Sequence, residues 1–141
     1  MAGQTEHSPL CILVIDDHRD ALEVFGLLLR KLGHSVHTSL DGERALEQIE
    51  TLHPDLIFLD LGMPGLDGYE VARRMRRHPN LKEARIVAVT GFGDRQRRDL
   101  AFEAGFDDYL VKPTTLSDLQ AVIDRTRNLL EEAGQAPHPK C

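Results

Sequence analysis

The stretch ILVIDDHRD, residues 12–20, places two acidic residues directly after a run of four apolar ones. An apolar run of this kind is typical of a strand that is buried on both faces of a sheet. Asp16 and Asp17 then lie at the carboxyl end of that strand, where their like charges repel each other. Either the pair caps the helix that follows, a role in which Asp is favoured, or it binds a ligand.

Strand-length apolar segments recur along the chain and alternate with segments of helical periodicity. The predicted strands are residues 10–16, 35–38, 55–60, 85–90 and 108–111. Five such strands alternating with five helices predict an α/β fold, a single-domain doubly wound parallel sheet with helices on both faces. The fourth helix, within residues 94–104, has few apolar anchors, so we expect it to be loosely held.

Length, composition and charge limit the classes of protein to which the chain can belong. The 141 residues, 41% of them hydrophobic, suffice for one globular domain, which we place at residues 9–132 between flexible tails at 1–8 and 133–141. The net charge of −6 argues against a general nucleic-acid or membrane-surface binder. Because no apolar run reaches the ~20 residues of a membrane span and no signal peptide is evident, we expect a cytoplasmic protein.

Polar residues stand at the carboxyl ends of the predicted strands. They are Asp16 and Asp17 after the first strand, Asp60 after the third, Thr90 after the fourth and Lys112 after the fifth. Because ligands of such folds bind beyond these ends, we expect the side chains to converge. At about 4 Å and an effective dielectric constant of about 20, each pair of carboxylates costs about 4 kcal/mol, which a bound Mg²⁺ would relieve.

The same edge of the sheet has the groups that phosphoryl transfer requires. Asp60 is the predicted nucleophile, because LIFLDLGMPGLDG places its carboxylate between a strand and a Gly- and Pro-rich loop that leaves it accessible. Lys112 offers an ammonium and Thr90 a hydroxyl to the oxygens of the transferred group. The product would be an acyl phosphate on Asp60, formed with Mg²⁺ as cofactor.

Four segments of the chain resemble the receiver domains of response regulators in two-component signalling. They are VIDDHRDALEVF, PDLIFLDLGMPGLDGYEVARRMR, IVAVTGFGD and AGFDDYLVKPTTLSDL, in the order and spacing of that family, and they cover roughly residues 10–130. The resemblance implies a flavodoxin-like, CheY-like fold with strand order 2-1-3-4-5. The segments look most like receivers of hybrid sensor histidine kinases, so we interpret the chain as a stand-alone regulator or as a receiver excised from such a kinase.

The resemblance also assigns roles to single residues. It implies that Asp60 is the phosphoacceptor, and that Asp16 and Asp17 hold Mg²⁺ directly or through water. Asp60 itself and the backbone carbonyl of Gly62 would be further ligands of the ion.

The remaining roles implied by the resemblance concern signal transmission. Thr90 corresponds to the switch hydroxyl, Lys112 to the phosphate-binding lysine and Tyr109 to the switch aromatic, which would fill space that Thr90 vacates on phosphorylation. The peptide between Lys112 and Pro113 is usually cis in this family.

The partners implied are a histidine kinase or a histidine phosphotransfer protein as donor. The output would pass through the face formed by the fourth strand, fourth helix and fifth strand, to a downstream protein or a second copy of the chain. The protein would phosphorylate itself and dephosphorylate slowly, without turning over external substrates, and would bind neither nucleic acid nor membrane.

Other interpretations remain open. A phosphatase of the haloacid dehalogenase type would need a second acid two residues after its nucleophile, and Gly62 stands there. A flavodoxin-type site would have to bind the phosphate of a cofactor, which the acidic DDHRD loop would repel. A pseudo-receiver, which binds partners without being phosphorylated, is the alternative function. His18 could touch the mouth of the site, but it is expected to face solvent in the first turn of a helix.

Overall fold

The computed structural model describes residues 9–62, 67–91, 93 and 95–134. Its centre is a five-stranded parallel sheet in the order β2-β1-β3-β4-β5. The strands are β1 (Cys11–Ile15), β2 (Ser35–Ser39), β3 (Leu56–Asp60), β4 (Arg85–Thr90) and β5 (Asp108–Val111). The predicted strands and their order are thus confirmed, with boundaries that differ by one residue at three of them.

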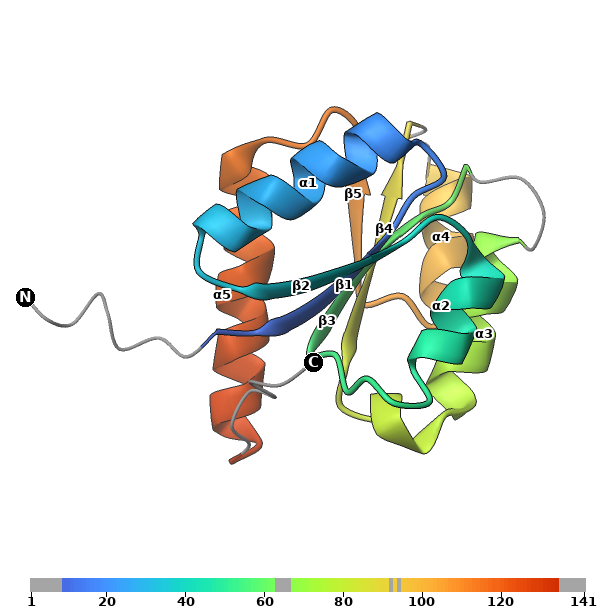
Figure 1. Cartoon of the computed structure of the whole chain (residues 1–141). Helices are drawn as coiled ribbons and strands as arrows, with labels where there is room; N and C mark the ends of the chain where they lie inside the picture. Colours follow the sequence, from blue (N-terminus) through green and yellow to red (C-terminus); the bar gives the residue numbers. More distant parts are fainter. Residues whose placement is uncertain (1–8, 63–66, 92, 94, 135–141) are drawn as a thin grey trace, which may run out of the picture.

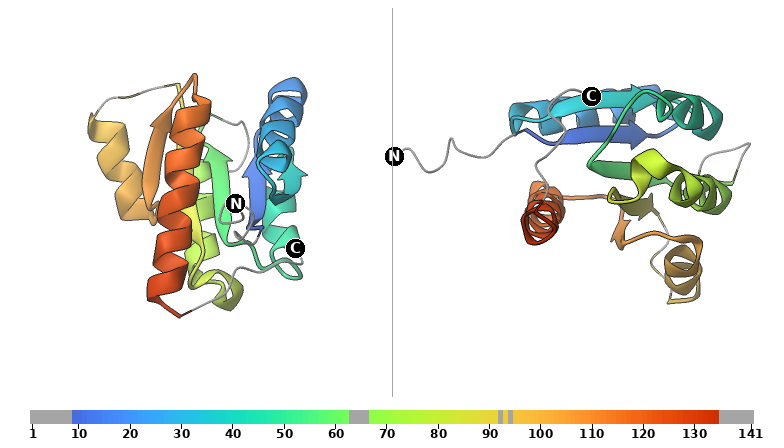
Figure 2. Two further views of the ribbon diagram at one scale, coloured as in Figure 1. Left: turned by 90° about the vertical axis from the view of Figure 1, so that its left-hand side faces the viewer. Right: turned by 90° about the horizontal axis from the view of Figure 1, so that it is seen from below.

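The helices lie on both faces of the sheet, as predicted (Figure 1). One face is covered by α1 (Arg19–Lys31) and α5 (Leu116–Glu132). The other is covered by α2 (Gly42–Gln48), α3 (Gly68–Arg77) and α4 (Arg95–Ala104), with the short helix η2 (Pro79–Leu81) after α3. Figure 2 shows the two helical layers from the side and from below. Within the described residues, no helix combines the length and the hydropathy that a membrane span needs.

The core consists of two apolar layers, one on each face of the sheet. In β1 and β3 every residue is buried, and successive side chains enter opposite layers. Leu13 and Leu59 pack against α2, α3 and α4, whereas Ile12 and Phe58 pack against α1 and α5. A strand covered on both faces needs apolar residues at every position, which explains the uninterrupted apolar run that precedes Asp16.

The helix ends follow the signals in the sequence. Gly33, Gly105 and Gly134 follow α1, α4 and α5 with φ angles of 97°, 111° and 72°, a region that side chains disfavour. A Cβ atom at Gly105 would also lie 2.7 Å from Arg76 Cγ. At the start of α5, Thr115 and Asp118 form the predicted capping box.

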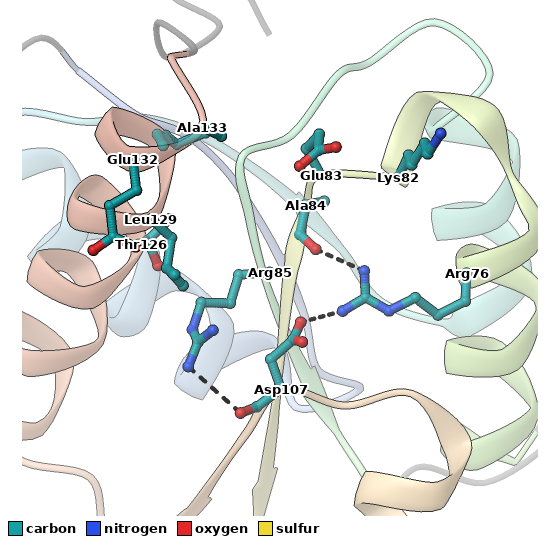
Figure 3. Close-up of a pocket in the computed structure, with 11 residues that line it drawn as sticks. Arg76, Lys82, Glu83, Ala84, Arg85, Asp107, Thr126, Leu129, Glu132 and Ala133 are labelled. Carbon is teal, nitrogen blue, oxygen red and sulfur yellow. Dashed lines mark hydrogen bonds and ion pairs between the residues drawn. The ribbon is translucent and has the colours of Figure 1, made fainter.

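Arg76 of α3 connects that helix to the ends of β4 and β5 that lie opposite the acidic edge (Figure 3). Its Nε donates to the carbonyl of Gly105 at 2.8 Å and its Nη1 to the carbonyl of Ala84 at 2.7 Å. Its Nη2 pairs with Asp107, whose carboxylate also accepts the backbone N–H of Ile86 at 2.8 Å. The guanidinium therefore fixes the carboxyl end of α4 and the first residues of β4 relative to α3.

The fourth helix has the weak anchoring that the sequence predicts. All ten residues of α4 are described, and only Ala101 and Ala104 among them are buried. The large apolar side chains of Leu100 and Phe102 are 44% and 46% exposed. Burying two alanines contributes little apolar area, so the apolar anchoring of α4 is weaker than that of α3, which buries Val71, Ala72 and Met75.

His34, between α1 and β2, is a buried histidine that stays neutral. Its Nδ1 accepts the backbone N–H of Leu10 at 3.1 Å, and 7% of the residue is exposed. Burial, and secondarily the positive charge of Arg127, lower the pKa of His34 from 6.5 to about 4. Between these two values the unfolded chain binds a proton at His34 that the folded protein does not bind.

We therefore expect His34 to reduce stability as the pH falls from 6.5 towards 4, by at most about 3 kcal/mol. Urea unfolding of wild type and His34→Gln, at pH 7 and pH 4.5, measures this contribution. The advantage of wild type over the variant should be largest at pH 7 and should shrink on acidification. An advantage of equal size at both pH values would contradict the expectation.

Candidate functional site

The carboxyl ends of β1 and β3 bring the predicted acidic residues together. Asp16 and Asp60 are buried, with 6% and 4% of their surface exposed. Lys112, which follows β5, donates from Nζ to Asp60 Oδ2 at 3.1 Å, and lies 3.8 Å from Asp16 Oδ2. The expected convergence of Asp16, Asp60 and Lys112, which are far apart in the sequence, is thus present in the fold.

Asp60 is held in place through both of its carboxylate oxygens. Oδ2 faces Lys112, and Oδ1 accepts the backbone N–H of Gly62 at 2.8 Å. A Cβ at Gly62 would lie 3.4 Å from the same Oδ1, so the backbone approaches the carboxylate closely. The Met63 to Leu66 part of the Gly- and Pro-rich loop lies outside the described residues.

Asp17 completes an acidic cluster. Ligand atoms of Asp16, Asp17, His18 and Asp60 all lie within 4.8 Å of one another. Oδ1 of Asp17 is buried and has no hydrogen-bond partner within the described part of the chain. A buried carboxylate oxygen without a donor is costly unless a cation binds it.

The donor set fits a hard divalent cation. Three carboxylates offer oxygen ligands, which Mg²⁺ prefers, and Oδ1 of Asp17 accepts no hydrogen bond in the described residues. The single ammonium of Lys112 leaves the cluster with two negative charges, which a divalent ion would neutralise. Asp16, Asp17 and Asp60 are therefore the residues that would hold Mg²⁺.

Thr90 ends β4 beside Asp60 and is buried, with 3% exposed. Leu61 N donates to the carbonyl of Val89 at 3.0 Å, so β3 and β4 stay paired up to the acidic residue. Lys112 N donates to the carbonyl of Thr90 at 2.7 Å, and the peptide between Lys112 and Pro113 is cis, as the resemblance implies. Thr90 and Lys112, the two residues expected to contact the transferred group, are therefore adjacent across the sheet and joined by a backbone hydrogen bond.

Tyr109 of β5 lies inside the core rather than on the surface. The residue is 6% exposed and belongs to the apolar layer under α3 and α4. The guanidinium of Arg98, on α4, lies 5.9 Å from the centre of the ring, a cation–π distance. The ring is thus buried in this structure, and the role of Tyr109 as the switch aromatic stays a prediction.

His18 lies at the acidic cluster, next to Asp16, Asp17 and Asp60. Its side chain is 70% exposed, as expected, yet its Nδ1 lies 3.2 Å from Oδ1 of Asp16 and 3.2 Å from Oδ1 of Asp17. It is also the N-cap residue of α1, with no side-chain hydrogen bond to the helix. Because His18 occupies the N-cap position, helix capping by Asp16 or Asp17 does not explain why two acidic residues stand there. In the sequence, the only indication that His18 lies at the acidic cluster is that it directly follows Asp17.

An apolar groove of about 700 Å³ leads from the acidic cluster along α1 and the start of α5. Val24, Phe25 and Leu28 of α1 line one side, and Pro113 and Leu119 line the other. Val24 is 59% exposed, so a bulky apolar side chain faces solvent next to the buried acids. An apolar surface that adjoins a charged site is typical of a place where a partner docks.

The sequence matches the response regulator receiver domain family over residues 12–124. It is 33% identical over 126 residues to the DNA-binding dual master transcriptional regulator RpaA of Synechocystis, a match that spans 89% of this chain and 51% of RpaA. It is 35% identical over 127 residues to the transcriptional regulatory protein ResD of Bacillus subtilis, spanning 90% of this chain and 50% of ResD. The chain spans about half the length of these curated relatives.

Solved structures agree with this match. The receiver domain of the sensor histidine kinase PA1611 of Pseudomonas aeruginosa PAO1, with a magnesium ion coordinated in its active-site cleft, superimposes with a TM-score of 0.78 at 31% identity. The superposition covers 86% of this chain and 99% of that one. A response regulator of Chloroflexus aurantiacus gives a TM-score of 0.76 at 37% identity, over 88% of this chain and 99% of the other.

Three observations lead to one assignment. They are the parallel sheet in the order 2-1-3-4-5, the three carboxylates and the lysine at its carboxyl edge, and these similarities. The chain belongs to the response regulator receiver domain family of two-component signalling.

Proposed function

We propose that Asp60 accepts a phosphoryl group from a phosphohistidine of a sensor kinase or phosphotransfer protein. The contact of Asp60 with Lys112, next to Asp16 and Asp17, is the observation that carries this proposal. A carboxylate oxygen of Asp60 attacks phosphorus, the bond from phosphorus to the donor imidazole breaks, and an acyl phosphate results. The family match supports the acceptor role, and the geometry supports the choice of Asp60 as the acceptor.

The fixed groups around Asp60 suit the charge that develops during transfer. Gly62 N holds Oδ1 of Asp60, so the carboxylate keeps one orientation as the donor approaches. Lys112 Nζ, 3.1 Å from Oδ2, would follow the negative charge onto the phosphoryl oxygens. A Mg²⁺ ion held by Asp16, Asp17 and Asp60, and by the carbonyl of Gly62, would supply further positive charge to those oxygens.

The apolar groove along α1 is our proposed docking surface for the phosphohistidine donor. Its lining of Val24 and Leu28 suits an apolar helix face of a partner, and its inner end opens at Asp60. A donor helix seated there would bring its imidazole to the carboxylate that must attack.

The acceptor assignment predicts a gain of one phosphoryl group on incubation with acetyl phosphate and Mg²⁺. Intact-mass measurement should show it in wild type and not in Asp60→Asn, and chelation of the metal should prevent it. Equal labelling of both proteins would place the acceptor elsewhere. If neither protein is labelled and neither responds to beryllofluoride, the chain acts as a pseudo-receiver.

The metal assignment predicts that Mg²⁺ raises the melting temperature of wild type by several degrees. At a concentration one hundred times Kd, binding should add about 2.7 kcal/mol of stability. Asp17→Asn should lose this gain and, because it removes a repulsive charge, should be at least as stable as wild type without metal. Asp20→Asn, an exposed change on α1, is the matched control and should keep the full response.

We further propose that phosphorylation acts through the face formed by β4, α4 and β5. The hydroxyl of Thr90 would move towards the new phosphoryl oxygens, and Tyr109 and α4 would shift with it. Leu100, Phe102 and Val111 are exposed apolar side chains of this face, and Arg95, Arg97 and Arg98 supply positive charge. Such a face suits an acidic downstream protein or a second copy of the chain.

Amide hydrogen exchange tests this coupling. Beryllofluoride with Mg²⁺ should change exchange in residues 95–104 and 108–111 of wild type, and should leave residues 42–48 of α2 unchanged. In Thr90→Val the change at residues 95–104 should be lost although the ligand still protects residues near Asp60. An unchanged α4 in saturated wild type would refute the coupling. Sedimentation of the same samples shows whether a second copy binds.

A further inference from the structure

We propose that His18 is a ligand of the metal centre, so that the site binds transition-metal ions such as Co²⁺ and Mn²⁺ through one imidazole and three carboxylates. The inference rests on the metal centre of the proposed function, but not on phosphoryl transfer. It adds a nitrogen ligand to a site whose other protein ligands are oxygens.

The spacing of the ligand atoms is the first observation that supports this role. Nδ1 of His18 lies 3.2 Å from Oδ1 of Asp16 and 3.2 Å from Oδ1 of Asp17. Adjacent ligands of an octahedral ion with metal–ligand distances of about 2.1 Å are separated by about 3.0 Å. Nδ1 therefore already stands at nearly the distance from both carboxylates that a shared ion requires.

The buried Oδ1 of Asp17, which accepts no hydrogen bond in the described residues, is the second observation. Nδ1 of His18 makes a hydrogen bond to Asp16, whereas Oδ1 of Asp17 is buried with no hydrogen-bond partner in the described residues. The contact between His18 and Asp17 thus has the distance of a hydrogen bond without its direction. An ion between the two side chains would satisfy both atoms.

The backbone holds His18 in a position from which its ring reaches the cluster. His18 N donates to Oδ1 of Asp16 at 2.9 Å, which fixes the residue at the start of α1. Its side chain is 70% exposed, and a neutral imidazole that carries its proton on Nε2 can offer Nδ1 to an ion. Ligation through Nδ1 then requires no desolvation of a buried group.

An imidazole changes which ions the site prefers. Imidazole nitrogen suits the later first-row transition metals, whereas Mg²⁺ prefers oxygen and keeps several waters. His18 would therefore add affinity for Co²⁺, and to a smaller degree Mn²⁺, while a water would serve Mg²⁺ equally well at the same position. The residue would determine metal preference without being needed for Mg²⁺.

Calorimetric titration of the full chain with Co²⁺ and with Mg²⁺ tests the inference. His18→Asn should bind Co²⁺ at least about tenfold more weakly than wild type, with Mg²⁺ affinity changed less than about threefold. His53→Asn, an exposed histidine between α2 and β3, is the matched control and should behave as wild type. The visible absorption of bound Co²⁺ should also shift in His18→Asn alone.

The outcomes separate this inference from the proposed function. Equal Co²⁺ affinity in wild type and His18→Asn, with Mg²⁺ bound by both, would overturn the role of His18 and leave the metal centre intact. Failure of both ions to bind wild type would overturn the metal centre and this inference together. A protein that binds Co²⁺ through His18 but is not labelled by acetyl phosphate would support the inference and refute the acceptor role.

Discussion

The repulsion between carboxylates gathered at one edge of the sheet is the constraint on which the rest of the structure depends. Asp16 and Asp60 are both buried, on neighbouring strands, and Asp17 adds a third charge. The carboxylates do not contribute to the stability of the fold, because the repulsion between each pair costs energy that the ammonium of Lys112 offsets only in part. A bound cation would offset this repulsion, and in the proposed function the same arrangement would orient Asp60 towards an electrophilic phosphorus.

The sequence predicts the sheet well because its inner strands are buried on both faces. β1 and β3 must then be apolar throughout, and their acidic ends are visible as abrupt changes in hydropathy. The helix ends are equally local: a glycine with positive φ or a capping box needs only a few consecutive residues. The acidic site follows from these elements, since parallel strands place their carboxyl ends at one edge.

Features that depend on rotamers or on distant pairs could not be predicted in this way. The burial of Tyr109 beneath Arg98 depends on how α4 packs, which no local pattern encodes. The contacts of Arg76 with Gly105 and Asp107 span about thirty residues and join three elements. The exposure of His18 follows from its place in the first turn of a helix, but the sequence does not give the position of its Nδ1, which lies 3.2 Å from an oxygen of Asp16 and 3.2 Å from an oxygen of Asp17.

The contacts of Arg76 also determine how α4 can move. They fix the helix at Gly105, its carboxyl end, whereas its amino end follows the segment after Thr90. In the proposed switch, α4 would therefore turn about Gly105, with the shift starting at the end of the helix nearest the acidic edge. The largest displacement would fall on the first turn, where Arg95, Arg97 and Arg98 lie, so a small shift beside Asp60 would move positive charge across the surface.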